Sequence, residues 1–292
     1  MTLITALKTG ERIVVMSDTA ISDRDAIRAD LLPGRLKSIT LGPRRTVSYA
    51  GLSAQALDVI RRLHRENIQS DEEVISRLRG ACSEFSGEVE FLACFHDDSK
   101  QARLVKITSS GVAEGANTYW IGNGDAARSL ASMELEIPPR FGDLPSYVTQ
   151  EEINFTYRFS KFIELHSDFV VGGAAITCVC SSNGHGYQSE AGATMLKPVQ
   201  VPDPVPPEVR EAEARTGMSR FAYHIYGPQE RGIAVVGFYL EQAATGYLHM
   251  PLFRDDALKV TADDQEAFSR IVIETSLEKK ADSLRGTQNR SI

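Results

Sequence analysis

A nearly continuous apolar strand close to the start of the chain constrains the fold most. Residues 13–18 read IVVMSD, and residues 2–8 before them form another short apolar segment with β-branched side chains. The polar turn at residues 9–12 separates the two segments and predicts a hairpin. An unbroken apolar strand is usually buried on both faces. We therefore expect a layered fold that covers this hairpin on both sides.

Blocks of helices and strands follow the hairpin. Two helices are predicted at 54–68 and 71–84, where apolar residues recur every three to four positions. Strands are expected at 36–41, 46–49, 89–96 and 102–108, in a run that ends at Trp120-Ile121, and at 172–180. Further helices are expected at 125–132 and 151–165. This order predicts an α+β fold, an αββα four-layer sandwich in which two sheets lie between helical layers.

The last third of the chain reads as a separate addition. The Pro-dense stretch KPVQVPDPVPPE at 197–208 predicts an extended connector. Beyond it we expect strands at 219–226, 232–240 and 244–250 and a helix at about 262–280. The predicted organisation is a sandwich domain at 1–196, a connector at 197–209, an appended C-terminal α/β extension at 210–280 and a polar tail at 281–292.

Composition narrows the class of protein. The chain has 292 residues, 42% of them hydrophobic, which is enough for a large buried core. Its formal net charge of -7, with 32 basic and 39 acidic residues, argues against nucleic acid as the main partner, because phosphate binding needs a basic face. No apolar run approaches the length of a membrane span, and the N-terminus lacks the features of a signal peptide. We therefore expect a cytoplasmic protein that does not bind membranes.

The spacing of cysteine and histidine argues against a metal centre. Cys82, Cys94, Cys178 and Cys180 contain no Cys-x-x-Cys pair, and the six histidines show no metal-ligand spacing. Buried free thiols are the expected state of these cysteines. The Gly-x-Gly stretch at 122–124 lacks the third glycine and the acidic residue of a dinucleotide site. The sequence thus predicts neither a metal nor a cofactor.

Four residues in the first part of the chain suit catalysis by a hydroxyl group. Thr2 follows Met1, Asp18 ends the second strand, Lys37 lies on the third and Gly51 ends the fourth. A threonine hydroxyl is a weak nucleophile that needs a base within hydrogen-bond reach. A free α-amino group, with a pKa of about 7.7–8.0, is suited to that task. Removal of Met1 would therefore give Thr2 both the nucleophile and its base.

The other three residues of this set suit supporting roles. An ammonium such as that of Lys37 stabilises the alkoxide, and a carboxylate such as Asp18 holds the ammonium in place. A backbone N–H at a helix start, here that of Gly51, supplies an oxyanion hole. Each residue alone also has an ordinary reading, as a solvated lysine, a turn aspartate and a structural glycine. Their joint spacing favours the catalytic reading.

At these residues the sequence resembles the proteasome β-subunit family. The stretches TLITALKTGERIVVMSDTAIS and GRLKSITLGPRRTVSYAGLSAQAL carry the likeness, and the only length change is a small insertion between Asp18 and Lys37. VEFLACFHDD, YWIGNGDAARSL and SDFVVGGAAITCVC extend it to about residue 190. The resemblance implies a sandwich of the N-terminal nucleophile hydrolase type, as in a bacterial-type proteasome homologue with a C-terminal extension.

The resemblance also implies roles for individual residues. Thr2 matches the nucleophile once Met1 is removed, Asp18 the acid partner, Lys37 the catalytic lysine and Gly51 the oxyanion donor. Asp168 matches the aspartate near the terminal amine. In two places the sequence departs from the family: Asn123 and Val171 stand where serines usually orient that amine and a bound water. Asn123 can still donate and accept hydrogen bonds, whereas Val171 cannot.

Substrate-binding positions follow from the same likeness. The main chain of Ser22 matches a segment that pairs with bound peptide. Tyr49 and Ser53, with Leu57 further in, match the pocket for the residue before the cleaved bond. Ser53 is also expected to cap the helix that starts there.

The function expected from the sequence is a threonine-type peptide hydrolase that works through an acyl-enzyme. The resemblance implies peptide or unfolded-protein substrates, a homo-oligomeric ring and an ATP-dependent unfoldase partner. Two alternatives remain open: an amidase of small molecules, and a catalytically silent assembly or scaffold subunit.

Overall fold

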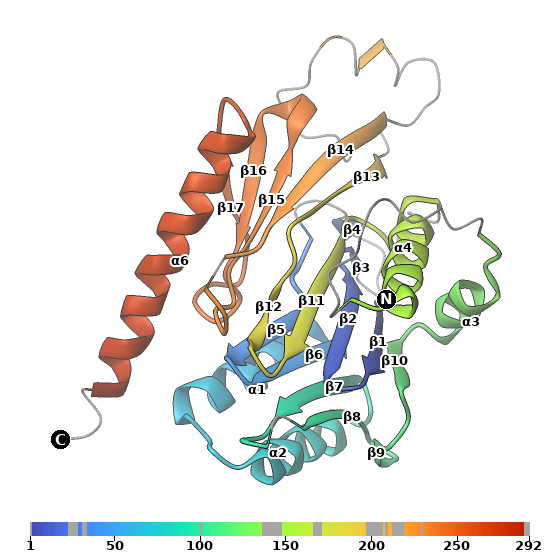
Figure 1. The fold of residues 1–292 in the computed structure, drawn as a ribbon, viewed down its shortest axis with the longest axis vertical. Helices are drawn as coiled ribbons and strands as arrows, with labels where there is room; N and C mark the ends of the chain where they lie inside the picture. Colours follow the sequence, from blue (N-terminus) through green and yellow to red (C-terminus); the bar gives the residue numbers. More distant parts are fainter. Residues whose placement is uncertain are drawn as a thin grey trace.

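In the part of the chain that the computed structural model describes, three five-stranded sheets make up the framework, and every strand pairing in them is antiparallel (Figure 1). The structure describes residues 2–22, 29–30, 34–99, 101–135, 148–165, 171–196, 207, 210–211, 219–228 and 230–288.

The first sheet is built around the N-terminal hairpin. Its strand order is β10-β1-β2-β11-β12, so the hairpin strands lie inside the sheet. The strands are β1 (Leu3–Thr9), β2 (Arg12–Asp18), β10 (Thr118–Gly122), β11 (Ala175–Ser181) and β12 (Gly184–Tyr187). The predicted hairpin is confirmed. Both of its strands are almost fully buried, as their unbroken apolar character requires.

The second sheet has the order β5-β6-β7-β8-β9. Its strands are β5 (Ser38–Gly42), β6 (Arg45–Gly51), β7 (Val89–His96), β8 (Ala102–Thr108) and β9 (Gly111–Glu114). A separate two-stranded ribbon pairs β3 (Ile21–Ser22) with β4 (Ala29–Asp30). The second sheet is a meander, in which each strand pairs with its neighbour in sequence.

The third sheet has the order β13-β14-β15-β16-β17. Its strands are β13 (Glu190–Leu196), β14 (Ser219–Tyr226), β15 (Val236–Leu240), β16 (Thr245–His249) and β17 (Leu258–Thr261), with the short 3-10 helix η2 (Glu241–Ala243) between β15 and β16. Two of these strands, β13 and β17, were not predicted from the sequence. Most of the predicted connector at 197–208 lies outside the described residues.

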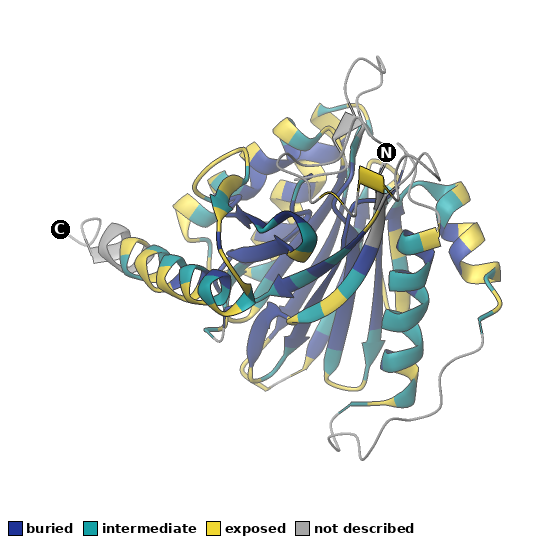
Figure 2. Cartoon of the chain, turned by 90° about the horizontal axis from the view of Figure 1, so that it is seen from above, coloured by how far each residue is buried: buried dark blue, intermediate teal, exposed yellow. Residues whose placement is uncertain are grey.

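Five helices cover the sheets in the described part of the chain. They are α1 (Ser53–Glu66), α2 (Asp71–Glu84), α3 (Gly124–Ser132), α4 (Gln150–Leu165) and α6 (Gln265–Gln288). The first four confirm the predicted helices, and α6 ends later than expected. Helices α1 and α2 pack on the second sheet, α3 and α4 on the first, and α6 on the third. Figure 2 shows the buried residues concentrated in the sheets and the exposed ones on the outer faces of the helices.

The expected αββα four-layer sandwich with an appended α/β extension is wrong. The described residues form three antiparallel sheets. The third combines β13, from the predicted sandwich domain, with four strands from the residues expected as an extension, and α6 packs on it. Phe221 and Phe238 of this third sheet lie in the same buried cluster as Ile4 of the first and Leu92 of the second. Local periodicity predicts a strand but not the sheet it joins, which is why the third sheet was read as an addition.

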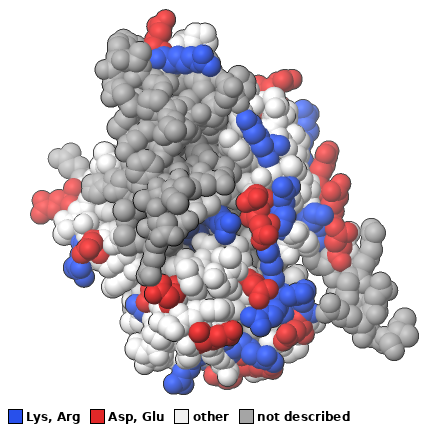
Figure 3. Space-filling model, turned by 180° about the vertical axis from the view of Figure 1, so that it is seen from behind, with Lys and Arg blue, Asp and Glu red and all other residues white. Residues whose placement is uncertain are grey.

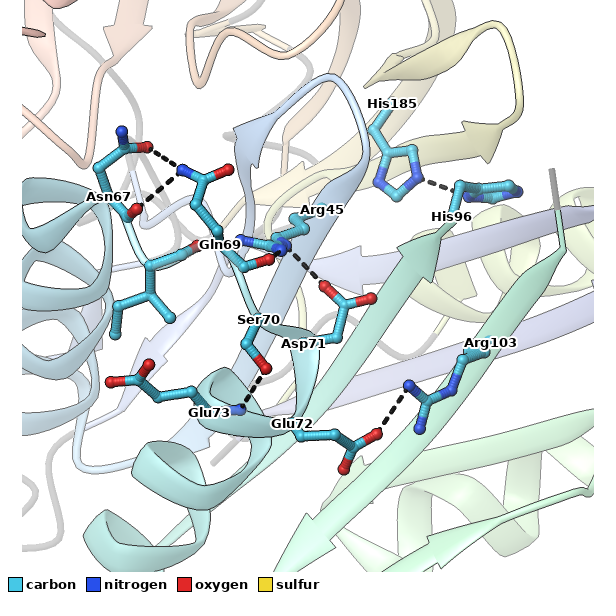
Figure 4. Close-up of polar contacts among 11 residues, drawn as sticks. Arg45, Asn67, Gln69, Ser70, Asp71, Glu72, Glu73, His96, Arg103 and His185 are labelled. Atoms are coloured by element: carbon cyan, nitrogen blue, oxygen red, sulfur yellow. Dashed lines mark hydrogen bonds and ion pairs between the residues drawn. The ribbon is translucent and has the colours of Figure 1, made fainter. Parts of the chain in front are cut away.

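A set of polar contacts fixes the junction between the second sheet and α2 (Figure 4). The Arg45 guanidinium at the start of β6 donates to the carbonyls of Ile68 and Gln69, and its Nε lies 2.8 Å from Asp71 Oδ1. The Ser70 hydroxyl accepts from the backbone N–H of Glu73 and caps α2. These contacts hold the start of α2 against the sheet.

The structure shows the state of the cysteines and the distribution of charge on one face. The prediction of buried free cysteines is confirmed at all four positions. On the face seen in Figure 3, basic and acidic side chains of the described residues are interspersed. In the described part of the chain, no helix is long and apolar enough to span a membrane.

Candidate functional site

Thr2 is held at the end of the first sheet by backbone contacts on both sides. Leu3 pairs with Gly122 of β10, and the Thr2 carbonyl accepts a hydrogen bond from the Asn123 N–H at 2.7 Å. The Leu3 N–H donates to Asp18 Oδ1 at 3.0 Å. Thr2 is 8% exposed, so it is nearly enclosed where β1 begins.

A buried ion pair lies next to this residue. Lys37 Nζ is 2.8 Å from Asp18 Oδ1 and 2.6 Å from the Ala20 carbonyl. Asp18 Oδ2 accepts from the Gly172 N–H at 3.4 Å. The carboxylate therefore joins four parts of the chain: β1, β2, the segment before β5 and the segment before β11. Both charged side chains are removed from water.

Burial and pairing act in opposite directions on these two groups. Burial raises the pKa of Asp18, and the Lys37 ammonium and the N–H groups of Leu3 and Gly172 oppose that rise. Burial lowers the pKa of Lys37, and Asp18 opposes that change. Each charge of the pair therefore stabilises the other against the cost of burial.

Gly51 and Asn123 have structural roles that are plain in the geometry. Gly51 has φ of +94°, and a Cβ there would lie 1.8 Å from the Glu88 carbonyl oxygen, so only glycine fits where β6 ends. The Asn123 side-chain oxygen accepts from the N–H groups of Asp125 and Ala126, which makes Asn123 the N-cap of α3. These roles do not conflict with the catalytic roles expected for either residue.

Val171 is part of the apolar layer under α4. It is 3% exposed and belongs to the cluster that contains Leu3, Met16 and Phe159. An apolar side chain at this position therefore fills the core rather than orienting a polar group.

The expected substrate-binding residues are only partly brought together. Tyr49 is buried, its hydroxyl lies 3.4 Å from the Leu36 carbonyl, and burial raises its pKa above the usual range. Ser53 is the first residue of α1 and not its cap, since Leu52 holds the N-cap position without a side-chain bond. Ser22 lies in β3, and its side chain is outside the described residues, as is the whole of Asp168.

Sequence reasoning missed one carboxylate beside the site. Glu90 Oε2 accepts from the Gly122 N–H at 2.8 Å, so it links β7 to the strand that pairs with Leu3. Glu90 is the single charged residue in the apolar run of β7 before His96. That interruption was the available signal, because an acidic residue inside a buried strand usually has a partner.

The comparisons with known proteins add no relative. No model of a known protein family matches the chain, and no curated protein sequence matches it. Among the described residues, no group of three or more His, Cys, Asp or Glu is arranged to hold a metal ion. Function is therefore inferred from the geometry around Thr2.

Proposed function

We propose that this chain hydrolyses peptide bonds with Thr2 as the nucleophile, once Thr2 is the first residue of the mature chain. The observation that carries the proposal is the buried Lys37–Asp18 pair, whose carboxylate binds the N–H of the residue after Thr2. Burial of an ion pair costs free energy. Such pairs are typical of functional sites, where the charges act on a neighbouring reactive group.

Lys37 has a donor left for the reaction. Among the described residues, Asp18 and the Ala20 carbonyl are the acceptors of its ammonium, so one of its three N–H bonds is available. In the proposed mechanism this N–H donates to the Thr2 hydroxyl. It would stabilise negative charge on that oxygen as the proton leaves.

The proposed reaction has two stages. Thr2 Oγ1 attacks the carbonyl carbon of the substrate, and its proton passes to the α-amino group of Thr2. The tetrahedral intermediate collapses as the C–N bond breaks, and the leaving amine takes that proton. Water then attacks the resulting ester with the α-amino group as base. The C–O bond to Thr2 breaks, which releases the acid and restores the hydroxyl.

The oxyanion of both intermediates needs a donor, and we assign the Gly51 N–H. This group lies at the end of β6, and Leu52, the N-cap of α1, follows it. Gly51 adopts a φ of +94° there, which side-chain-bearing residues rarely tolerate. A rigid backbone donor is effective because it needs no rearrangement when charge develops. The proposal rests on this site and not on the fold, since one fold hosts many functions.

The wider expectations remain predictions of the sequence resemblance. They are the relation to proteasome β-subunits, assembly into a homo-oligomeric ring, an ATP-dependent unfoldase partner and a cytoplasmic location.

The test compares the native chain with Thr2→Val and Thr2→Ser, using intact-mass spectrometry and a peptide epoxyketone probe. We expect a mature chain that begins at Thr2, carries one probe adduct on this residue and cleaves peptides. Valine keeps the shape of threonine without the hydroxyl, so Thr2→Val should lose the adduct and at least about a thousandfold in kcat. Thr2→Ser should keep part of the probe labelling and part of the peptide cleavage.

Thr5→Val is the matched control, because it makes the same change three residues further along β1. Its hydroxyl bonds only the Tyr119 carbonyl among the described residues, so cleavage and the adduct should persist. Retention of Met1 together with no adduct would overturn the proposal and favour a silent subunit. A processed, labelled protein that cleaves small amides but no peptide would favour the amidase.

A further inference from the structure

The proposed reaction needs its nucleophile and its oxyanion donor at a fixed spacing, and the two come from different sheets. Thr2 directly precedes β1 in the first sheet, and Gly51 ends β6 in the second. The sheets meet beside them at Gly122 of β10, where an added Cβ would lie 3.3 Å from the Ala50 Cβ. The spacing therefore depends on how the end of β10 is held against the second sheet.

The backbone at Gly122 also lies directly against Thr2. Gly122 has φ of +92°, and a Cβ there would be 2.1 Å from the Thr2 carbonyl oxygen, which leaves no room for a side chain. The next residue, Asn123, donates its N–H to the same carbonyl at 2.7 Å. A shift of the backbone at residues 122–123 would therefore move Thr2 as well.

Glu90 holds this backbone from the second sheet. The Gly122 N–H donates to Glu90 Oε2 at 2.8 Å. In the pairing of β6 with β7, Glu90 lies opposite Ala50, the residue before Gly51. One side chain therefore links the backbone that anchors Thr2 to the strand pair that carries Gly51. Because the acceptor is charged, this hydrogen bond is stronger than one between neutral groups.

No other group explains a carboxylate at this position. Residues 91–95 of β7 are apolar and buried, and Glu90 interrupts the apolar run at its start. Among the described residues, Glu90 has no cationic partner, and the Gly122 N–H is the group that it binds. Glutamate is rarely enclosed without a partner. The contact with Gly122 is therefore the structural reason for a carboxylate in this strand.

We propose that Glu90 is a positioning residue for the reaction at Thr2, an inference that rests on the proposed function. Its hydrogen bond to Gly122 fixes the Thr2 carbonyl and thereby sets the spacing between the Thr2 hydroxyl and the Gly51 N–H. A misplacement of about 1 Å at a reacting group can cost about a hundredfold in rate. The contact therefore affects kcat more than it affects substrate binding.

The first test follows the contact without any reaction. Amide hydrogen exchange, measured by NMR on the full chain, reports the protection of the Gly122 and Asn123 N–H groups. Glu90→Met has a similar length but no acceptor oxygen, so both groups should exchange at least about tenfold faster than in the native chain. Glu90→Gln keeps an acceptor and should keep the protection. Unchanged exchange in Glu90→Met would overturn the proposal.

Glu114→Met is the matched control. It makes the same change on β9 of the second sheet, where the Glu114 carboxylate binds the Arg103 guanidinium. Exchange at Gly122 and Asn123, and kcat, should stay within about twofold of the native values. Effects as large as those of Glu90→Met would overturn the proposal, because loss of any carboxylate from this sheet would then be enough.

Kinetics with a peptide reporter separate positioning from a merely structural role. Counting active sites with the epoxyketone probe corrects for unfolded protein. Per labelled site, Glu90→Met should lower kcat at least about tenfold and change KM by about twofold or less. Glu90→Gln should retain most of kcat, because it restores the acceptor. Native kcat in Glu90→Met, or an equal loss in Glu90→Gln, would overturn the proposal.

A second variant keeps the test decisive if Glu90→Met fails to fold by circular dichroism. Glu90→Asp keeps the charge on a side chain one methylene shorter, so it should lose the Gly122 contact and show the same loss of kcat. Cleavage that neither variant changes would remove the role of Glu90 and leave the hydrolase. Faster exchange of Asn123 in a chain that cleaves no peptide would remove the hydrolase and leave the anchoring of Thr2 by Glu90.

Discussion

At the scale of single residues, the Lys37–Asp18 pair is the most consequential contact in the molecule. Both side chains are buried. Among the described residues, the other groups that bond them are the backbone N–H groups of Leu3 and Gly172 and the Ala20 carbonyl. A buried ion pair often adds little net stability compared with apolar residues, yet removal of one partner leaves an uncompensated buried charge. The pair therefore makes the fold sensitive at the same residues that are proposed to support catalysis.

Lys37→Met should lower the free energy of unfolding by about 3–5 kcal/mol, because Asp18 stays buried without its cation. Chemical denaturation measures the change. The double variant Asp18→Asn with Lys37→Met should lose less than the sum of the two single losses, with a coupling of at least about 1 kcal/mol. Additive losses would mean that the pair is not coupled in solution.

A second residue-scale feature is a pair of histidines that joins the first and second sheets (Figure 4). His96 Nδ1 and His185 Nε2 are 2.7 Å apart, and His185 Nδ1 lies 3.0 Å from the Thr46 hydroxyl. His96 Nε2 contacts the Glu11 carbonyl at 2.8 Å. Burial, with smaller effects of the charges of His96 and Arg231, lowers the pKa of His185 from 6.5 to about 3.

The pKa of His185 sets a pH dependence of stability. Between pH 6.5 and about 3 the unfolded chain binds a proton at this residue and the folded chain does not, so unfolding becomes easier as the pH falls. One such group contributes up to about 1.4 kcal/mol per pH unit. His185→Gln keeps a hydrogen-bond donor and an acceptor. It should reduce the loss of unfolding free energy between pH 6.5 and 4.5. Denaturation curves at several pH values measure the unfolding free energy. The same dependence on pH in the variant and the native chain would contradict the prediction.

At the scale of elements, the attachment of α6 to the third sheet depends on two positions without side chains. Gly237 of β15 and Gly246 of β16 lie under Phe268, which is fully buried. A Cβ at Gly246 would lie 2.0 Å from Phe268 Cε2. The two glycines form a recess that the ring fills, and this contact holds the helix close to the strands.

Gly246→Ala should therefore destabilise the protein by about 1–3 kcal/mol, since the ring has to move and α6 loses its contact with the sheet. Thermal unfolding followed by circular dichroism measures the change. Gly80→Ala is the control, because a Cβ at this position in α2 has no neighbour within 4 Å. It should raise stability by up to about 1 kcal/mol through helix propensity. Equal effects of the two changes would argue against the recess.

At the scale of the whole molecule, one buried cluster spans all three sheets. It joins Ile4 and Ile176 of the first sheet, Leu92 of the second, and Tyr223 and Phe238 of the third. A cluster shared in this way couples the unfolding of the sheets, because none can leave without exposing the apolar face of another.

The full chain should unfold in one cooperative step, with equal calorimetric and van't Hoff enthalpies. A fragment of residues 1–196, the domain predicted from the sequence, lacks the strands that cover this cluster. It should show no sharp transition and should bind a hydrophobic dye. A fragment that unfolds as sharply as the full chain would show that the third sheet is dispensable.

The sequence by itself determined most of the local elements and indicated the contact between Asp18 and Lys37. Strong periodicity and turn residues predicted the N-terminal hairpin and helices α1 to α4, and the spacing of Asp18 and Lys37 predicted a pair that the structure shows in contact. These features depend on residues that are near in sequence or chemically distinctive.

Only the tertiary structure decided how the sheets are arranged and what surrounds the site. Three features depend on pairings between distant segments. β13 begins a third sheet, this sheet shares a core with the other two, and His249 lies beside Arg35. An apolar strand fits many neighbours equally well by pattern alone. The choice among them is made by packing over the whole molecule, which no local pattern records.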